Sequence, residues 1–193
     1  MRRGRTKIAS VARQILIVTG DAGESFETLY AWQRLIEAGF TPRISAPSKR
    51  RLHLVIHDFE PGWDTYIEKP GYVAESDLTF DDVRIDDYDA VLVLGGRAPE
   101  YLRHDQRVLD IVRGFDAAQK WVFAICHGVQ ILAAADLIRG KRVTAYQHCR
   151  WEIQAAGADY VTADQAVRDG RIVTGQTWQS HPEFYRLVFQ CLG

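Results

Sequence analysis

The sequence has 193 residues, enough for one domain with a hydrophobic core, and its 47% hydrophobic and 25% charged residues are typical of a folded globular protein. A formal net charge of -1 excludes a strongly basic protein, so we expect neither nucleic acid nor a membrane surface as a partner. The longest apolar runs, residues 90–94 and 121–125, are too short to cross a bilayer.

A basic segment begins the chain, with Arg2, Arg3, Arg5 and Lys7 close together. Such a cluster suits a nucleic-acid arm or a frayed, solvated end, and we favour the second, a flexible N-terminus over residues 1–13. No apolar stretch of the kind that a secretory signal needs follows it, so we expect a cytoplasmic protein.

Residues 14–19 form a short apolar, β-branched run, which predicts a buried strand. A helix is expected next, capped by Ser25 and ended by Gly39. Four large apolar residues follow the helical period and are expected on one face: Phe26, Leu29, Trp32 and Ile36. Residues 41–46 predict a second strand.

The pattern changes between residues 48 and 80. Prolines, glycines and aromatic residues interrupt this stretch, and its apolar residues alternate more than they repeat with helical spacing. We interpret it as a hairpin-rich insertion within a single domain that spans residues 14–193.

Strands and helices alternate through the rest of the chain. Unbroken apolar runs predict buried strands at 90–94 and 121–125. The other expected elements are helices at 105–120, 129–138 and 151–156, a short strand at 142–144, two short strands within 166–173, and a last helix at 182–192. Ser180 and Glu183 have the spacing of a capping box for that helix.

This alternation predicts an α/β fold whose sheet is mostly parallel and covered by helices on both faces. In such folds ligands bind beyond the carboxyl ends of the strands. Three loops follow the three clearest strands, at residues 20–25, 95–100 and 126–128, so we expect their polar groups to converge.

Cys126 is the main candidate for a reactive residue. It lies between an apolar strand and an apolar helix, in a turn that resembles a nucleophile elbow with cysteine in place of serine. A helix N-terminus favours the thiolate, so we expect Cys126 to ionise near neutral pH. Gly128 leaves room where the strand and the helix approach closely. The alternative is a buried cysteine that serves only packing.

Other polar groups are expected near this thiol. Glu24 suits a carboxyl group that hydrogen-bonds the sulfur or moves a proton, although an acidic residue is also ordinary beside a helix start. Gly95 and Gly96 either form an oxyanion hole with the amide of His127 or simply make a tight turn. The side chain of His127, next to the nucleophile in a sharp turn, is expected to point elsewhere, which counts against it as a general base within one subunit.

No metal site is predicted. The three cysteines, at 126, 149 and 191, are widely spaced and include no Cys-x-x-Cys pair, which also excludes a disulfide framework. His53 and His57 share one face of an extended segment without a third ligand, and His148 with Cys149 likewise lacks partners.

Two sequence blocks, LGGRAPEYLR at 94–103 and AICHGVQILAAA at 124–135, together with the loop of Glu24, resemble the ThiJ/PfpI (DJ-1/PfpI) family over nearly the whole chain. The resemblance implies a flavodoxin-like three-layer sandwich, class I glutamine amidotransferase-like, in which Cys126 is the nucleophile and Glu24 its carboxyl partner. In PfpI-type members, the positions of His127 and Glu100 complete a triad with the glutamate donated by a neighbouring subunit. A homo-oligomer, either a dimer or a hexamer, is therefore implied.

Three further segments, 57–72, 144–146 (TAY) and 181–184 (HPEF), are similar to the glyoxalase III-like branch known from plants. Substrate contacts are then expected from four residues, with no cofactor and no metal: Gly95, Gly96, Arg97 and His181. Two positions depart from the family pattern. Ser25 stands where relatives often carry aspartate, and Leu94 replaces the proline often found before the double glycine.

The function expected from the resemblance is that of a glutathione-independent glyoxalase or deglycase. Cys126 would attack a small carbonyl substrate, a methylglyoxal-like dicarbonyl, and Glu24 would shuttle a proton between its adjacent carbons. A cysteine amidase or peptidase that uses Cys126, His127 and Glu100 is the first alternative. The second is a redox-stress sensor whose Cys126 thiol is oxidised rather than turned over.

Overall fold

A seven-stranded sheet forms the centre of the protein, whose computed structural model describes residues 13–193. Its strands follow the order β10–β11–β7–β6–β1–β2–β5. Every neighbouring pair is parallel except β10 and β11, which are antiparallel. The predicted α/β architecture with a mostly parallel sheet is therefore confirmed.

The strands of this sheet are short, and those in its centre are buried along most of their length because helices cover both faces. They are β1 (Gln14–Val18), β2 (Thr41–Ala46), β5 (Leu78–Thr79), β6 (Ala90–Val93), β7 (Trp121–Ile125), β10 (Ala166–Asp169) and β11 (Ile172–Gly175). Two smaller ladders lie outside it. They pair β3 (Arg51–Asp58) with β4 (Ile67–Glu75) and β8 (Arg142–Val143) with β9 (Asp159–Tyr160).

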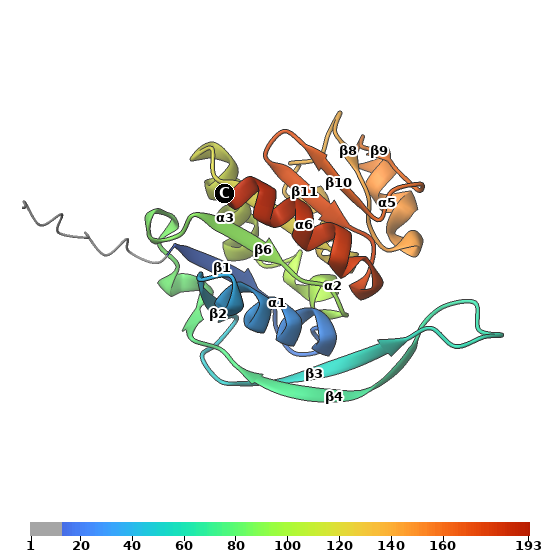
Figure 1. The fold of residues 1–193 in the computed structure, drawn as a ribbon, viewed down its shortest axis with the longest axis horizontal. Helices are drawn as coiled ribbons and strands as arrows, with labels where there is room; N and C mark the ends of the chain where they lie inside the picture. The colour runs from blue at the N-terminus through green and yellow to red at the C-terminus, as the bar shows by residue number, and fades with distance from the viewer. Residues whose placement is uncertain (1–12) are drawn as a thin grey trace, which may run out of the picture.

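Helices form the two outer layers of the sandwich. They are α1 (Ser25–Glu37), α2 (Ala98–Leu102), α3 (Gln106–Ala117), α4 (Val129–Ala134), α5 (Arg150–Ala155) and α6 (His181–Leu192). Figure 1 shows α1 and α6 in front of the sheet and α3 behind it. The short helix α2 was not predicted, although proline in its first turn is a normal helix start.

The cap of α1 differs from the prediction. Glu24 is the N-cap residue, and its side chain accepts the N–H of Glu27 at 2.6 Å. Ser25 is instead the first helical residue, and its hydroxyl accepts the N–H of Tyr72 from the hairpin. An acidic cap at this place suits the positive end of the helix dipole.

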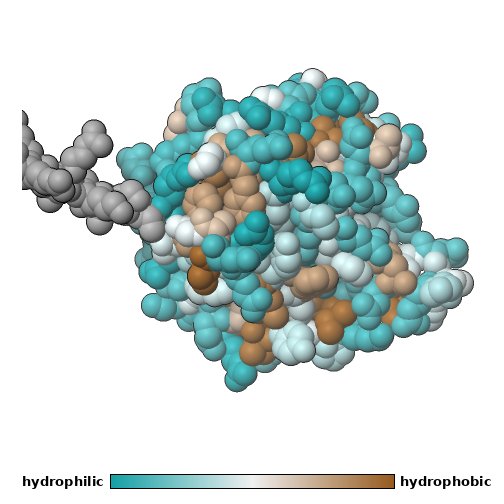
Figure 2. All heavy atoms as spheres, viewed as in Figure 1, coloured by the Kyte–Doolittle hydropathy of each residue, from teal (hydrophilic) through white to brown (hydrophobic). Residues whose placement is uncertain are grey.

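The predicted apolar face of α1 is only partly buried: Trp32 packs against the core, but two of its four residues are exposed. Phe26 and Ile36 are 48% and 49% exposed, whereas Thr28, Ala31 and Leu35 are buried. The smaller side chains let the helix approach the sheet closely, and Phe26 and Ile36 turn outward. In Figure 2, brown apolar residues accordingly interrupt the hydrophilic surface over the lower part of the view, where α1 and the hairpin lie.

The capping box predicted for α6 is also wrong. Ser180 precedes this helix without a capping hydrogen bond from its side chain. Its hydroxyl donates to the side chain of Gln165 and accepts the N–H of Thr177. These hydrogen bonds belong to the short turn Trp178–Ser180, so the hydroxyl of Ser180 does not cap α6 and no capping box forms with Glu183.

Residues 48–80 contain the predicted hairpin as one long antiparallel pair, β3 with β4. This hairpin, called here the β3–β4 hairpin, is fixed across the loop that follows β1. The N–H of Ala22 donates to the carbonyl of His53 at 2.7 Å, and the N–H of Val55 donates to the carbonyl of Gly23 at 2.9 Å. The insertion therefore lies at the carboxyl edge of the sheet, where ligands are expected.

The basic N-terminal segment falls almost entirely outside the described residues, so its predicted flexibility stays a prediction. Arg13 is the first residue described, and its guanidinium donates to the backbone carbonyls of Leu192 and Gly193. None of the helices within residues 13–193 is long and apolar enough to cross a membrane.

Gly128→Ala is expected to lower the free energy of unfolding, because a Cβ at this position would lie 2.5 Å from the carbonyl oxygen of Val93. Overpacking of this kind costs about 1–3 kcal/mol, and urea unfolding followed by circular dichroism measures it. Gly114→Ala is the matched control, since its Cβ would meet only the side chain of Ile85, at 3.1 Å. Equal stability of Gly128→Ala and the wild type would contradict the steric argument.

Candidate active site

The three loops predicted to converge do meet at the carboxyl edge of the sheet. Gly23 and Gly96 form an isolated β-bridge, and the N–H of Glu24 donates to the carbonyl of Gly95 at 3.3 Å. A Cβ on Gly95 would lie 2.6 Å from the Cβ of Cys126, which places the third loop beside the other two.

Cys126 begins the short turn Cys126–Gly128, between β7 and α4. Its φ angle of 58° is left-handed, a strained conformation that is typical of a nucleophile elbow. Gly128 lies against the carbonyl of Val93, so the close approach predicted for it is confirmed. Cys126 is nevertheless enclosed, with only 5% of its surface exposed.

The thiol of Cys126 is not ionised near neutral pH, in contrast to the prediction. Burial raises its pKa well above the usual value, and negative charge at Glu27 raises that pKa further. The backbone N–H groups of His127 and Gly96 act in the opposite direction but do not compensate for burial. Formation of the thiolate therefore needs a base that accepts its proton.

The carboxyl group beside the thiol belongs to Glu27, which the sequence analysis missed. Its Oε2 accepts the N–H of Gly95 at 2.6 Å. A Cβ on Gly95 would lie 2.9 Å from this Oε2 and 3.0 Å from the sulfur of Cys126, so the two reactive atoms flank one point. Burial raises the pKa of Glu27, and the neighbouring Glu24 raises it further, which brings its titration toward neutral pH.

Glu24 has a different place from the one predicted. Its two carboxyl oxygens accept the N–H groups of Glu27, at 2.6 Å, and of His57, at 3.5 Å. Among residues 13–193, no hydrogen bond joins Glu24 to Cys126. The two acidic residues are three positions apart, and the start of α1 at Ser25 points Glu27 toward the sulfur while Glu24 caps the helix.

The oxyanion hole predicted from Gly95, Gly96 and His127 is smaller than expected. The N–H of Gly95 is occupied by the carboxyl group of Glu27. The N–H groups of Gly96 and His127 remain directed at the sulfur of Cys126. Two backbone donors are therefore available to an oxygen that develops negative charge next to this sulfur.

His127 contacts its own neighbour, which the sequence analysis did not expect. Its Nδ1 lies 3.3 Å from the sulfur of Cys126 within one chain. Burial lowers the pKa of His127 to about 4, so the imidazole is neutral at pH 7. Its ring is covered by Tyr66 and Tyr146, with ring centroids 5.8 and 5.0 Å away, and does not project toward solvent.

Arg97 is tied to the β3–β4 hairpin. Its Nε and Nη2 donate to the two carboxylate oxygens of Glu68, at 2.5 and 2.9 Å. The same Glu68 contacts the Nε2 of His57 at 3.0 Å. A substrate contact by Arg97 would have to compete with this bidentate pair.

The remaining two predicted site residues make no hydrogen bond to the thiol or to His127. His181, the first residue of α6, is buried against α1, where its ring stacks on Tyr30 with centroids 4.6 Å apart. Glu100 on α2 is exposed, and no described side chain hydrogen-bonds it. Its donation to a neighbouring subunit stays a prediction.

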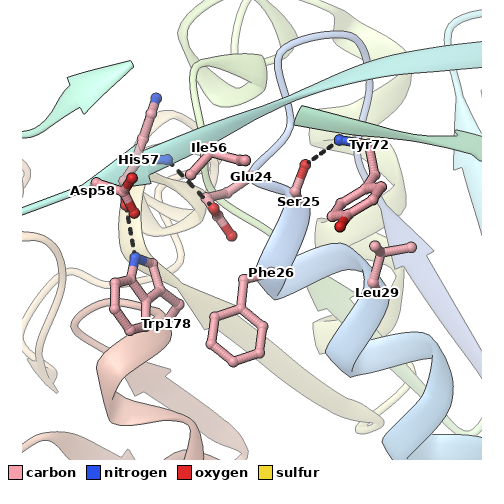
Figure 3. A pocket seen from close by; sticks show the side chains of 9 residues that line it. All are labelled: Glu24, Ser25, Phe26, Leu29, Ile56, His57, Asp58, Tyr72 and Trp178. Carbon is pink, nitrogen blue, oxygen red and sulfur yellow. Dashed lines mark hydrogen bonds between the residues drawn. The ribbon is translucent and has the colours of Figure 1, made fainter. Parts of the chain in front are cut away.

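A pocket of about 260 Å³ lies beside the carboxyl group of Glu24, and Cys126 is not among its lining residues. Figure 3 shows the apolar side chains of Phe26, Leu29 and Trp178 around it. The ring of His57 projects from β3 away from the Glu24 carboxyl group in the same view. In residues 13–193, no three His, Cys, Asp or Glu side chains gather to hold a metal ion.

Comparison with known families matches residues 13–190 to the model described as the DJ-1/PfpI family. Protein DJ-1 homolog D of Arabidopsis thaliana is 39% identical over 97% of this chain, which spans only 50% of that relative's length. Deglycase PfpI of Pyrococcus furiosus is 34% identical over 91% of this chain and 99% of its own length.

Solved structures give the same fold. A two-domain protein of Anabaena variabilis, described as containing DJ-1/ThiJ/PfpI-like and ferritin-like domains, has a TM-score of 0.81 at 25% identity over 94% of this chain and 48% of its own. Drosophila melanogaster DJ-1beta has a TM-score of 0.75 at 20% identity over 92% of this chain and 89% of its own. The predicted flavodoxin-like sandwich is thus confirmed.

Glu27→Gln is expected to lower the pKa of the Cys126 thiol, because it removes a negative charge beside the sulfur while its amide oxygen still accepts the N–H of Gly95. The pH dependence of iodoacetamide alkylation, followed by mass spectrometry at Cys126, measures this pKa. Glu24→Gln keeps an acceptor for the α1 cap and is expected to shift the pKa less. A higher thiol pKa in Glu27→Gln would refute the charge interaction.

Proposed function

The chain belongs to the DJ-1/PfpI family, and on this basis we propose that it is a cysteine-dependent glyoxalase or deglycase. Its substrates are methylglyoxal-like dicarbonyls or the adducts that they form, and it needs no glutathione. One observation carries the proposal: the thiol of Cys126 and the carboxyl group of Glu27 flank the same point beside Gly95. Relatives named as deglycases in Pyrococcus furiosus and Escherichia coli support the same class of reaction.

The first step is attack of the Cys126 sulfur on the aldehyde carbon. Glu27 takes the thiol proton as the carbon–sulfur bond forms, because the pKa of the buried thiol is too high for spontaneous ionisation. The aldehyde oxygen gains negative charge next to the N–H groups of Gly96 and His127. Return of the proton from Glu27 to this oxygen gives a neutral hemithioacetal.

The second step converts the hemithioacetal into a thioester. The carboxylate of Glu27 removes the proton from the former aldehyde carbon and delivers it to the adjacent ketone carbon, while the hydroxyl proton moves to the ketone oxygen. A carboxyl group whose pKa is raised toward neutrality suits both directions of this transfer. Water then cleaves the thioester, which releases a 2-hydroxy acid and restores the thiol.

An amidase or peptidase remains the second candidate, because the neutral His127 lies 3.3 Å from the sulfur as a base would. The amidase or peptidase needs Glu100, whereas the glyoxalase or deglycase does not. Loss of amide turnover in Glu100→Gln, with lactate formation unchanged, would therefore favour the amidase or peptidase. The sensor alternative is less favoured. Oxidation follows thiolate character and exposure, and the thiol of Cys126 is buried with a raised pKa.

We also propose that the chain forms a homo-oligomer and that it is cytoplasmic. The exposed position of Glu100 on α2 supports donation of this residue to a neighbouring copy. The exposed apolar residues of α1, Phe26 and Ile36, offer surface that a second subunit would cover. Light scattering on the purified chain measures its mass in solution.

Purified protein is expected to convert methylglyoxal into lactate, measured with lactate dehydrogenase. Cys126→Ala should abolish this activity, and Glu27→Gln should lower kcat by about 10²–10⁴-fold, the usual contribution of a positioned acid–base group. Cys191→Ala is the matched control, since this half-buried cysteine lies in α6. Lactate formation by Cys126→Ala at the wild-type rate would end the proposal. Glycated N-acetylarginine, assayed in parallel, separates deglycase from glyoxalase activity.

A further inference from the structure

The sulfur of Cys126 is enclosed within the protein. Gly95 and the carboxyl group of Glu27 lie against it on one side. Nδ1 of His127 lies 3.3 Å from it on another. The pocket beside Glu24 does not include Cys126 among its lining residues. For a small molecule to reach the sulfur, part of this enclosure must therefore move.

Two tyrosine rings complete the enclosure. The ring centroids of Tyr66 and Tyr146 lie 5.8 and 5.0 Å from that of His127, and 5.6 Å from each other. Burial, together with negative charge at Glu100 and Cys126, raises the pKa of Tyr66 to about 12, as expected for a ring close to the sulfur. Tyr146 is buried in the body of the protein, whereas Tyr66 is half-buried and comes from the β3–β4 hairpin. Tyr66 is therefore the part of the enclosure that can move without disturbing the central sheet.

Tyr66 ends the loop that joins β3 to β4, residues 59–66, called here the hairpin loop. Residues 59–65 are exposed, and Figure 1 shows this end of the hairpin extending beyond the rest of the molecule. Among residues 13–193, one hydrogen bond between side chains holds the hairpin loop to a residue outside the hairpin. It joins the hydroxyl groups of Thr65 and Tyr146, which lie 2.9 Å apart. Segments with few buried contacts open locally at a lower free-energy cost than the core.

The base of the hairpin, by contrast, is fixed to the body of the protein. Arg97 donates two hydrogen bonds to Glu68, and Nε1 of Trp178 donates to the carbonyl of His57 at 2.8 Å. The ring of Tyr66 stacks on that of His57, with centroids 3.8 Å apart, so the base gives the closed loop a surface to return to. Movement of the hairpin is therefore confined to the hairpin loop, with hinges at the ends of its two strands.

We propose that Tyr66 is a gate over the thiol of Cys126 and that the hydrogen bond between Thr65 and Tyr146 holds it shut. A carbonyl substrate reaches the sulfur when the hairpin loop moves away from Tyr146, and the return of Tyr66 encloses the bound substrate. Closure of this kind excludes water from the reacting groups. Because only the hairpin loop moves, the opening admits small carbonyl compounds more readily than polypeptides. The gate concerns access to the thiol and does not depend on which reaction the thiol performs.

Alkylation of Cys126 by iodoacetamide in the full chain, followed by mass spectrometry, tests the gate. Thr65→Val removes the hydrogen bond to Tyr146 and keeps the shape of the side chain. It should raise the alkylation rate about 2–10-fold, the usual contribution of one hydrogen bond. Tyr66→Ala removes the covering ring and should raise the rate further. Tyr66→Phe keeps the ring and should be alkylated at the wild-type rate.

Trp63→Ala is the matched control, because Trp63 is an exposed aromatic residue on the same loop, and this variant should react as the wild type does. Wild-type alkylation rates in both Thr65→Val and Tyr66→Ala would overturn the inference. An equal rise at Cys149, which is buried in the same chain, would also overturn it, since the change would then have loosened the whole fold. None of these outcomes bears on lactate formation, which tests the proposed function itself.

Discussion

A buried carboxyl group, that of Glu27, is the constraint on which the reactive centre depends. Burial of an acidic side chain is costly unless hydrogen-bond donors compensate; the N–H of Gly95 satisfies Oε2 at 2.6 Å, while Oε1 has no partner among the described residues and the pKa of the group stays raised. Helix α1 must therefore begin where Glu24 caps it and Glu27 faces the sheet. Gly95 and Gly96 carry no side chain because a Cβ there would strike Cys126 or the backbone of Glu24.

The β3–β4 hairpin covers the nucleophile elbow of Cys126 at the edge of the sheet and thereby encloses the site. It places Tyr66 over His127, and the ion pair of Arg97 with Glu68 holds it to the loop after β6. Enclosure raises the pKa of the thiol, so the proton must leave as the carbon–sulfur bond forms rather than before it. The same enclosure favours proton transfer within the site over exchange with solvent.

The strand–turn–helix around Cys126 could be predicted because apolar runs and glycines are local signals. Glu27 was missed, although its spacing of four from Ala31 and eight from Leu35 places it on the buried face of α1 and was visible in the sequence. The pairing of Glu68 with His57 could not be predicted, since it depends on the register of a hairpin whose two strands are joined by an irregular loop. The burial and the neighbouring charges that raise the pKa values of Glu27 and Cys126 also follow only from long-range contacts.

The most direct test of the buried acid–base pair is the titration of Glu27 itself, by carbon NMR of protein labelled at the glutamate carboxyl carbons. Burial raises the pKa values of both Glu24 and Glu27, so we expect two resonances to titrate above the ordinary glutamate range, and the one that disappears in Glu27→Gln is that of Glu27. The thiol of Cys126 lowers this pKa through a hydrogen bond, so Cys126→Ala should raise it further. A Glu27 resonance that titrates in the ordinary range, unchanged in Cys126→Ala, would contradict the pairing of this carboxyl group with the thiol.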